Sequence, residues 1–563
     1  MAKRSNEPEH LPAVAAEYIE LIIRKMRYRL KVRQEVKAEL VGHFADALKD
    51  CQAQEERQTK AQELIDEFGD GRLLAKLIRR GKKRCRPLWR TMVARSFQAV
   101  GILFGLLVCY CVYISFAQPK IRVNYTDEVN RLARPVADED LNAAVLYEKA
   151  IEAYVEPPKI ERKVRQRTKK MDLLEAIGNK KWIADLTNEE IDLLEQWIAD
   201  STKAIGFFEK ASEKPYCWWE RKAKDDVLLM LDMPLGHIRD LGRLICWRAK
   251  LKANEGQIEG AFDDLLSCYR TGRHLVGPRT IIEQLVGMAM RRLAVGNALT
   301  VLSKCRVEEQ VLENYCRRLR ELAGDDIFTV DFQTEKFLYR DIVQRCYTDD
   351  GRGSGHMVTG GLRELGGVLG MNFYSEEAMG KVVSYGARLG MALVSADRGR
   401  IVAKFEEAYK RHEAWAKMTP WEQRVGGVDE WEHKEFEETS FLEQVRYSLY
   451  YMLMPALRRV GEISHRNRTE VECLMTVMAV LWYHKETQRY PENLSELVEA
   501  GLLKKLPMDP YSDKPLVYRR TDDRFTLYSV GLNFEDDGGK MGTKNGKPNK
   551  WADEGDAVFW PVQ

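Results

Sequence analysis

The sequence predicts a mainly α-helical protein with one membrane-spanning helix and a small α+β domain at the C-terminal end. Three observations lead to this prediction. A long uncharged stretch runs from Ser96 to Pro119, apolar residues recur at helical spacing over most of the chain, and strand-like alternation begins only after Lys485. With 563 residues, of which 45% are hydrophobic and 31% charged, the chain has the length and composition of a folded protein of several domains.

We divide the chain into five parts. They are a small cytoplasmic helical bundle, a single transmembrane helix, an irregular, solenoid-like extracytoplasmic helical region, a Gly-rich loop with further helices, and a C-terminal α+β domain with a small antiparallel sheet. These parts cover residues 1–90, 96–119, 120–350, 351–464 and 465–563 respectively.

Residues 1–90 contain four short amphipathic patterns. Their apolar residues recur at helical spacing in four groups: Val14, Tyr18, Ile19, Ile22 and Ile23; Val36, Leu40, Phe44 and Leu48; Ala61, Leu64, Ile65 and Phe68; and Leu73, Leu74, Leu77 and Ile78. Between the last two groups, Gly69-Asp70-Gly71 has the composition of a helix end followed by a new helix start. Four such helices can bury a modest core.

This bundle resembles the small helical prefix domain that bacteria place ahead of transmembrane segments. In that family a Glu-Leu-x-x-His helix precedes an Ala-rich helix that ends in Phe/Leu-Gly-Asp, and the matching residues here are Glu39, Leu40, His43, Phe68, Gly69 and Asp70. The resemblance implies a regulatory or docking role without a catalytic site. We therefore interpret His43 as a structural residue on a mixed helix face, with a metal or acid–base role as the alternative.

The stretch from Ser96 to Pro119 is predicted to cross the membrane. As a helix it is about 36 Å long at 1.5 Å per residue, which exceeds a hydrocarbon core of about 30 Å. The alternative is a buried core helix. A basic run without an intervening acid precedes it: Lys76, Arg79, Arg80, Lys82, Lys83, Arg84, Arg86, Arg90 and Arg95. We expect the helix to lie in a bacterial inner membrane. By the positive-inside rule, the N-terminus is then cytoplasmic and most of the chain after the helix is extracytoplasmic.

The distribution of charge argues against a nucleic-acid partner. Residues 1–95 hold 22 Lys and Arg against 14 Asp and Glu, so the net charge of +3 for the whole chain leaves the remainder near neutral. The expected partners are the membrane and other envelope proteins, and the oligomeric state is left open. Seven of the eleven cysteines follow the membrane segment without CxxC spacing, a pattern compatible with disulfides and equally with free buried thiols.

Helical patterns dominate residues 120–350. The segment Ala249–Val276 combines two helical patterns, a turn at Gly256 and a small residue, Ala261, where the helices would cross. It resembles a tetratricopeptide-like hairpin, and Asn142–Val155 resembles half of another. No regular period of about 34 residues is present, so we expect an irregular helical solenoid. The basic run Glu161–Lys170 is interpreted as a solvated loop or helix face, with binding of a glycan, lipid headgroup or polyanion as the alternative.

Residues 350–464 contain several motifs that we weigh against a structural interpretation. The Gly-rich stretch Asp349–Gly370 reads as a mobile loop or a hinge, because it lacks the Gly-Lys-Ser/Thr end of a phosphate-binding loop. The three tryptophans of this region are interpreted as interdomain packing rather than as a sugar-stacking platform: Trp415, Trp421 and Trp431.

The C-terminal region changes in texture. A long helix is expected from Arg466 to Lys485, followed by a proline turn, a short helix and two alternating strands, Leu516–Arg520 and Arg524–Val530, joined across Thr521-Asp522-Asp523. This order resembles the globular domain of the type II secretion major pseudopilins. The residues that carry the resemblance are Tyr490, Pro491, Leu494, Leu497, Pro507, Asp509, Pro510, Tyr511, Tyr518, Tyr528, Ser529, Gly531, Asp536, Asp537 and Gly538.

One departure from that family changes its functional meaning. A pseudopilin has its polymerisation helix at the N-terminus, whereas here the corresponding helix begins after residue 460 and carries charges such as Glu470 and Lys485. We therefore expect a borrowed fold that serves contact or stability. The resemblance also implies calcium in the loop after the sheet, with the oxygen donors Asn533, Asp536, Asp537, Asp553 and Asp556.

These patterns together predict a single-pass, membrane-anchored bacterial envelope protein that acts as an extracytoplasmic interaction scaffold. One alternative is an accessory component of a type II secretion or pilus-like machine. The other is an envelope hydrolase with an unrecognised site, for which the candidate residues are His356, Glu413, His433 and Glu437. A non-enzymatic role is favoured, because no GxSxG, HExxH or SxxK arrangement appears after the membrane segment.

Overall fold

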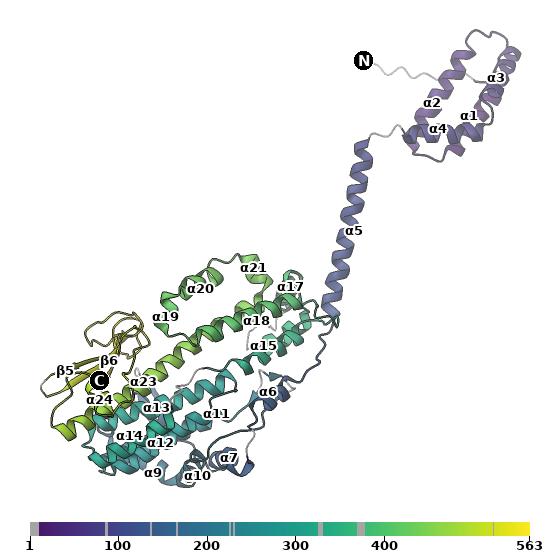
Figure 1. Ribbon diagram of the computed structural model, residues 1–563. Coiled ribbons are helices and arrows are strands. Elements are labelled where there is room, and N and C mark those ends of the chain that lie inside the picture. The colour runs from purple at the N-terminus through teal and green to yellow at the C-terminus, as the bar shows by residue number, and fades with distance from the viewer. Residues whose placement is uncertain are drawn as a thin grey trace. The chain divides into compact units, whose positions relative to one another are not determined.

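The computed structural model describes residues 11–84, 88–135, 138–164, 167–224, 227–228, 231–324, 330–368, 378–521 and 523–562 (Figure 1). The chain divides into two compact units, residues 1–110 and 111–563. It is mainly helical with small antiparallel sheets, which confirms the predicted fold class at this coarse level. Some residues that the sequence analysis used lie outside the described part: Arg86, residues 165–166, residues 369–370 and Asp522.

The first unit contains the four helices predicted for residues 1–90. They are α1 (Ala13–Met26), α2 (Leu30–Ala47), α3 (Gln54–Phe68) and α4 (Gly71–Arg84). Tyr18, Ile22 and Phe44 belong to their shared core. Three predicted core positions are wrong. The inward face of α1 passes through Ala15 and leaves Val14 41% exposed, and Leu73 and Leu77 of α4 are 58% and 53% exposed. The break before α4 is present at Gly69, whose φ of 75° is the left-handed conformation that glycine adopts without strain.

Two helices among the described residues are long and apolar enough to cross a membrane. One is Met92–Phe116, the greater part of α5 (Leu88–Phe116), with a mean hydropathy of 2.3; the other is Ile281–Lys304, helix α13, with a mean hydropathy of 1.3. Their environments differ, since 6% of the first is buried and 61% of the second. Helix α13 packs against α11, α12 and α23, so protein already covers its apolar surface.

The second unit is built from packed helices. One hydrophobic core joins many of them, while buried residues such as Tyr339, Phe405 and Tyr450 lie outside that core. The core is continuous from Ala143 to Phe559 and includes residues on both sides of residue 465. The helices are α6 (Tyr125–Ala133), α7 (Ala144–Glu152), α8 (Leu173–Ile177), α9 (Asn188–Asp200), α10 (Thr202–Ser212), α11 (Leu235–Asn254), α12 (Ile258–His274), α13, α14 (Glu309–Ala323), α15 (Gln333–Cys346), α16 (Thr359–Val368), α17 (Ala378–Val394), α18 (Arg398–Trp415), α19 (Pro420–Val425), α20 (Val428–Phe436), α21 (Phe441–Arg446), α22 (Ser448–Leu453), α23 (Pro455–Thr487) and α24 (Ser495–Glu499), with 3-10 turns at Glu139–Leu141 and Ile183–Asp185.

The hairpin predicted at Ala249–Val276 is present as α11 and α12. Gly256 lies in the turn with φ 83°, and the small residues Ala249 and Ala261 are both fully buried. A closer approach joins α12 to α13, where a Cβ on Gly272 would lie 2.6 Å from the carbonyl oxygen of Gly287. Glycine at these two positions therefore lets the backbones of two helices touch.

Two segments differ from their sequence interpretation. The basic run Glu161–Lys170 is neither a loop nor a helix, since it falls in an antiparallel hairpin of β1 (Lys159–Val164) and β2 (Arg167–Asp172). The prediction failed because only a few apolar residues mark the alternation, among them Ile160, which is 5% exposed and pairs with Met171. The Gly-rich stretch forms a turn at its start, but from Thr359 it continues as helix α16 instead of a loop.

The C-terminal part contains a three-stranded antiparallel sheet. Strand β6 (Phe525–Ser529) is central and pairs with β5 (Val517–Arg520) and β9 (Ala557–Trp560). Helix α23 packs against β6 and β9, and it begins at Pro455, earlier than the expected Arg466. The remaining strands are short: β3 (Lys222–Ala223), β4 (Leu231–Asp232), β7 (Thr543–Lys544) and β8 (Lys547–Pro548).

Candidate functional site

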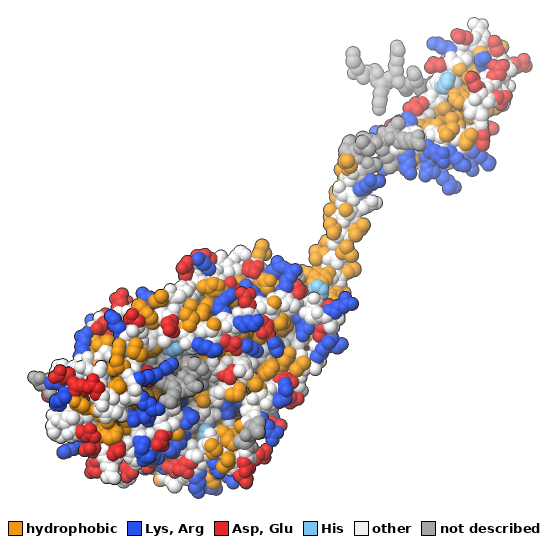
Figure 2. Space-filling model, viewed as in Figure 1, with side chains coloured by type: hydrophobic (Ala, Val, Ile, Leu, Met, Phe, Trp, Pro, Cys, Tyr) orange, Lys and Arg blue, Asp and Glu red, His pale blue; other side chains and the backbone are white. Residues whose placement is uncertain are grey.

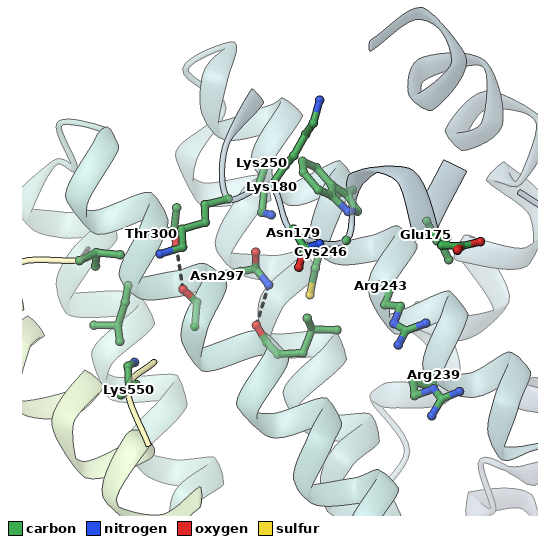
Figure 3. Close-up of a pocket in the computed structure, with 18 of the residues that line it drawn as sticks. Glu175, Asn179, Lys180, Arg239, Arg243, Cys246, Lys250, Asn297, Thr300 and Lys550 are labelled. Carbon is green, nitrogen blue, oxygen red and sulfur yellow. Dashed lines mark hydrogen bonds between the residues drawn. The ribbon is translucent and has the colours of Figure 1, made fainter. Parts of the chain in front are cut away.

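A cavity in the second unit has a volume of about 980 Å³. Helices α11 and α13, the segment around α8 and the C-terminal segment that ends in β9 form its walls (Figure 3). A volume of this size is in the range of small-molecule sites. We call this cavity the α11–α13 cavity.

Helix α11 presents a row of side chains to this cavity. Arg239, Arg243, Cys246, Trp247 and Lys250 follow one another at helical spacing and therefore lie on one face. The two arginines are exposed, whereas the last three residues are buried. The row thus runs from the solvent-exposed end of the cavity to a buried end at Lys250.

Lys250 is the least expected residue of this row. It is 6% exposed, and its Nζ lies 3.6 Å from the centroid of the Trp247 ring. Among the described residues it has no hydrogen bond or ion pair with a carboxylate. Burial lowers the pKa of Lys250 from 10.5 to about 8, although the nearby groups of Cys246 and Asp185 act in the opposite direction. An amine in this position is partly deprotonated near pH 8.

A second lysine reaches the cavity from the C-terminal segment. Lys550 places its Nζ 4.5 Å from the centroid of the Phe559 ring, and burial lowers its pKa despite the charge of Glu470. Glu470 has other partners, since it accepts a hydrogen bond from Trp551 Nε1 at 2.8 Å and forms an ion pair with Arg292 at 3.2 Å. Figure 3 shows Lys550 on the side of the cavity away from Arg239 and Arg243.

Other charges of the cavity are neutralised within the chain. Lys180 forms an ion pair with Glu190, and Arg243 forms one with Asp240 at 3.0 Å. The carboxylate of Asp172 caps α8 by accepting a hydrogen bond from the backbone N–H of Glu175 at 2.6 Å. These pairs leave Lys250, which is buried, and Lys550, which is half-buried, as two cations of the cavity without an ion pair to a carboxylate among the described residues.

Helix α13 supplies the polar floor between these lysines. Asn297 Nδ2 donates to the carbonyl oxygen of Leu293 at 2.7 Å, and Thr300 Oγ1 donates to that of Gly296 at 2.9 Å (Figure 3). The second N–H of the Asn297 amide and the lone pairs of Thr300 remain available to a ligand. Gly296 faces open space, because a Cβ added there would meet no atom within 4 Å.

Four of the five predicted calcium ligands have protein partners. Asp536 forms an ion pair with Arg519 at 2.9 Å and accepts a hydrogen bond from the Tyr528 hydroxyl at 2.7 Å. Asp556, fully buried, accepts hydrogen bonds from the backbone N–H groups of Asp537 and Gly539. Asn533 Nδ2 donates to Asp537 Oδ2 at 2.7 Å.

The fifth predicted ligand, Asp553, is exposed and lines a different cavity of about 300 Å³ beside Arg424. Although burial of Asp536 opposes ionisation, the hydrogen bonds from Tyr528 and Gly538 and the charge of Arg519 lower its pKa. An arginine thus supplies a positive charge at the carboxylate where a cation was expected. No group of three or more His, Cys, Asp or Glu arranged for a metal is found in the described part of the chain.

These oxygen donors are already engaged by protein groups, whereas calcium is held by about six to eight oxygen ligands. Calcium at this loop remains a prediction that a binding experiment must test.

The residues considered for a hydrolase belong to separate elements. Glu413 of α18 forms an ion pair with Lys336 at 2.6 Å, and the His433 and Glu437 side chains contact each other at 2.8 Å on the surface of α20. His356 precedes α16 and lies with its ring edge toward Tyr113. Among the described residues, these side chains form no group of three or more His, Cys, Asp or Glu arranged for a metal.

The remaining sequence candidates have structural partners. His43 is exposed with its ring against Phe68. Trp415 and Trp431 contact each other, with the Arg411 guanidinium over the Trp431 ring, while Trp421 lies beside Phe534 of the C-terminal part. The seven cysteines that follow α5 are free thiols, and Cys305 alone among them is partly exposed.

The cavity residues were missed by the sequence analysis, although α11 carried a signal. Arg239, Arg243 and Lys250 place three cations at helical spacing on one face of the helix. Lys550 lies three hundred positions later in the chain and offered no such sign. The sequence matches no protein-family model, and comparisons with curated proteins and with solved structures give no match.

Proposed function

We propose that this protein is a single-pass membrane protein whose second unit acts outside the cytoplasm as an interaction scaffold. The observation that carries the proposal is the exposed apolar surface of α5. Large side chains along it are half to three-quarters exposed: Phe97, Val100, Ile102, Leu103, Phe104, Leu106 and Leu107. Folded soluble proteins rarely expose an apolar surface of this extent to water, because its hydration is unfavourable. A lipid bilayer would cover this surface.

Charge on the N-terminal side supports the orientation. Helix α4 carries Arg72, Lys76, Arg79, Arg80, Lys82 and Lys83, and these cations gather on one side of that helix in Figure 2. Positively charged segments next to a membrane helix remain in the cytoplasm. The second unit is then extracytoplasmic, and the resemblance of residues 1–90 to bacterial prefix domains agrees with this arrangement.

A second apolar surface in the second unit supports contact with the same membrane. Phe441 and Leu442 of α21 are 77% and 70% exposed, and α21 packs against α17. Tyr385 of α17 is hydrogen-bonded to Ser115, near the C-terminal end of α5, with 2.5 Å between their hydroxyl oxygens. Exposed aromatic and aliphatic residues close to a membrane helix suit the headgroup region of a bilayer.

The membrane test uses the full chain and alkaline carbonate extraction. Changing Leu103 and Leu107 to lysine should move the protein from the pellet to the soluble fraction, because two charges near the centre of the helix cost about 6 kcal/mol relative to leucine. Val425→Lys, at a 70% exposed apolar residue of α19, is the matched control. Membrane retention of the double variant equal to that of the control would contradict the proposal.

The scaffold role is tested separately, by crosslinking in intact membranes and identification of the captured proteins. We expect envelope proteins as partners. Turnover of a glycan or peptide by the purified protein, lost on changing Glu413 or His433 to alanine, would replace the scaffold with the hydrolase alternative.

One observation favours the second candidate, an accessory role in a type II secretion or pilus-like machine. Helix α23 packs on the β5–β6–β9 sheet, the arrangement implied by the pseudopilin resemblance. The same helix also packs against α13 and α14, so its apolar side is occupied by its own chain and is not free to enter a filament. Co-purification with pseudopilins is the result that would favour this role.

A further inference from the structure

We propose that the α11–α13 cavity binds a small amphipathic organic anion, with its carboxylate or phosphate group beside Lys250 and its apolar part against the aliphatic and aromatic wall. This inference concerns a ligand site and does not depend on the membrane topology. It rests on the charge balance, the wall chemistry and the open space of the cavity.

The charge balance calls for an anion from outside the chain. Lys250 is more than nine-tenths buried, lines the cavity and has no carboxylate partner among the described residues. Lys550, which is half-buried, is a second lysine of the cavity without an ion pair to a carboxylate among the described residues, since Glu470 is engaged by Trp551 and Arg292. The acids of the cavity are capped, paired or exposed at its mouth, as Glu156 is. Water screens exposed charges, whereas a buried ammonium needs a counter-charge.

The ring of Trp247 does not replace that counter-charge. A cation over an aromatic face is attracted to the ring, but this attraction offsets only part of the cost of burial. The role of the contact with Trp247 is to position the ammonium group of Lys250. It holds Nζ of Lys250 at a fixed position at the buried end of the cavity, where an acid group can accept its hydrogen bonds. The free N–H of Asn297 provides a neutral donor on the same wall.

The rest of the wall indicates an apolar body for the ligand. Leu174, Leu293, Val558 and Phe559 line the cavity together with the lysines. A volume of about 980 Å³ accommodates a molecule of drug-like size. Inorganic phosphate alone would leave these side chains facing water, so an acid with an aryl or alkyl group fits better.

Two sources of such an acid share this chemistry, a soluble aryl acid and a lipid-derived acid. The experiment therefore has two arms, phenyl phosphate and dodecyl phosphate, with benzyl alcohol and dodecanol as the neutral counterparts. The full chain is used in nanodiscs of zwitterionic lipid, and binding is measured by calorimetry. Empty nanodiscs give the background for the long-chain pair.

We expect saturable binding of at least one phosphate and at least tenfold weaker binding of its neutral counterpart. Lys250→Met should weaken the phosphate at least tenfold. Gly296→Leu should also abolish binding, because it fills open space without removing a charge. Lys203→Met, at an exposed lysine of α10, is the matched control and should bind as the unmodified protein does.

The arm that binds identifies the source of the acid. Equal binding by Lys250→Met and by the control would overturn the proposal, and so would equal binding of phosphate and alcohol. Failure of both phosphates to bind the unmodified protein at millimolar concentration would overturn it as well. These outcomes leave the membrane proposal unaffected, since that proposal is tested by extraction.

Discussion

Replacing the buried amine of Lys250 should make the second unit more stable at neutral pH. Lowering a lysine pKa from 10.5 to about 8 corresponds to about 3 kcal/mol of destabilisation while the amine is protonated, at 1.36 kcal/mol per pKa unit. Lys250→Met removes this cost, keeps an unbranched side chain of similar length and loses the cation–π contact, which contributes about 1 to 2 kcal/mol. The net gain expected at pH 7 is therefore about 1 to 2 kcal/mol.

The gain should depend on pH in a defined direction. The pKa is lower in the folded state, so between pH 8 and pH 10.5 the unfolded chain binds the proton that the folded chain has released. Stability of the unmodified protein relative to Lys250→Met should rise over this window. The advantage of the variant should disappear by about pH 10.5, with Asp185 and Cys246 as the groups whose charges oppose the shift.

The assay is urea unfolding of the full chain, followed by tryptophan fluorescence at several pH values. The comparison between variant and unmodified protein cancels the titration of the other lysines and of the thiols. Lys203→Met should differ from the unmodified protein by less than about 0.5 kcal/mol, as for an ordinary surface change. A Lys250→Met protein that is less stable at pH 7, or whose stability difference does not change with pH, would refute the reasoning.

Two further predictions concern packing and the C-terminal loop. Gly272→Ala should lower the free energy of unfolding by about 1 to 3 kcal/mol, because its Cβ would lie 2.6 Å from a carbonyl oxygen of α13. Gly260→Ala is the control and should be tolerated, because the nearest neighbour of its Cβ is a lysine side chain at 3.6 Å. Equal melting temperatures of the two variants would contradict the close approach of α12 and α13. If calcium binds the loop, a chelator should lower the melting temperature of the unmodified protein but not that of a variant with both Asp536→Ala and Asp537→Ala. Identical melting curves of the unmodified protein with and without calcium would contradict the predicted calcium site.

The sequence was sufficient for elements whose pattern is local. The turn at Gly256 and the helices around it could be placed because helical spacing and a glycine are read from neighbouring residues. The β1–β2 hairpin could not, because a strand of mostly charged residues shows its alternation at too few positions. The strand conformation of that segment depends on the pairing of β1 with β2, which the local sequence pattern does not show.

The candidate site was partly readable for the same reason. The cationic row of α11 is a local pattern that the sequence contains, although it was not recognised there as one wall of a cavity. The depth of Lys250, by contrast, depends on α13 and on the turn Ile183–Asp185, which pack against α11 only in the folded chain. The five predicted calcium ligands could be selected as oxygen donors, but nothing in the sequence indicated that Arg519 would pair with Asp536.

The central claim is the membrane topology, and reporter fusions test it most directly. A reporter that is active only in the cytoplasm, fused after Arg80, should be active, and a reporter that is active only outside the cytoplasm should be active when fused after Gln563. Each reporter exchanged to the other position should be silent. The reverse pattern, or cytoplasmic activity at both positions, would contradict the placement of the second unit outside the cytoplasm.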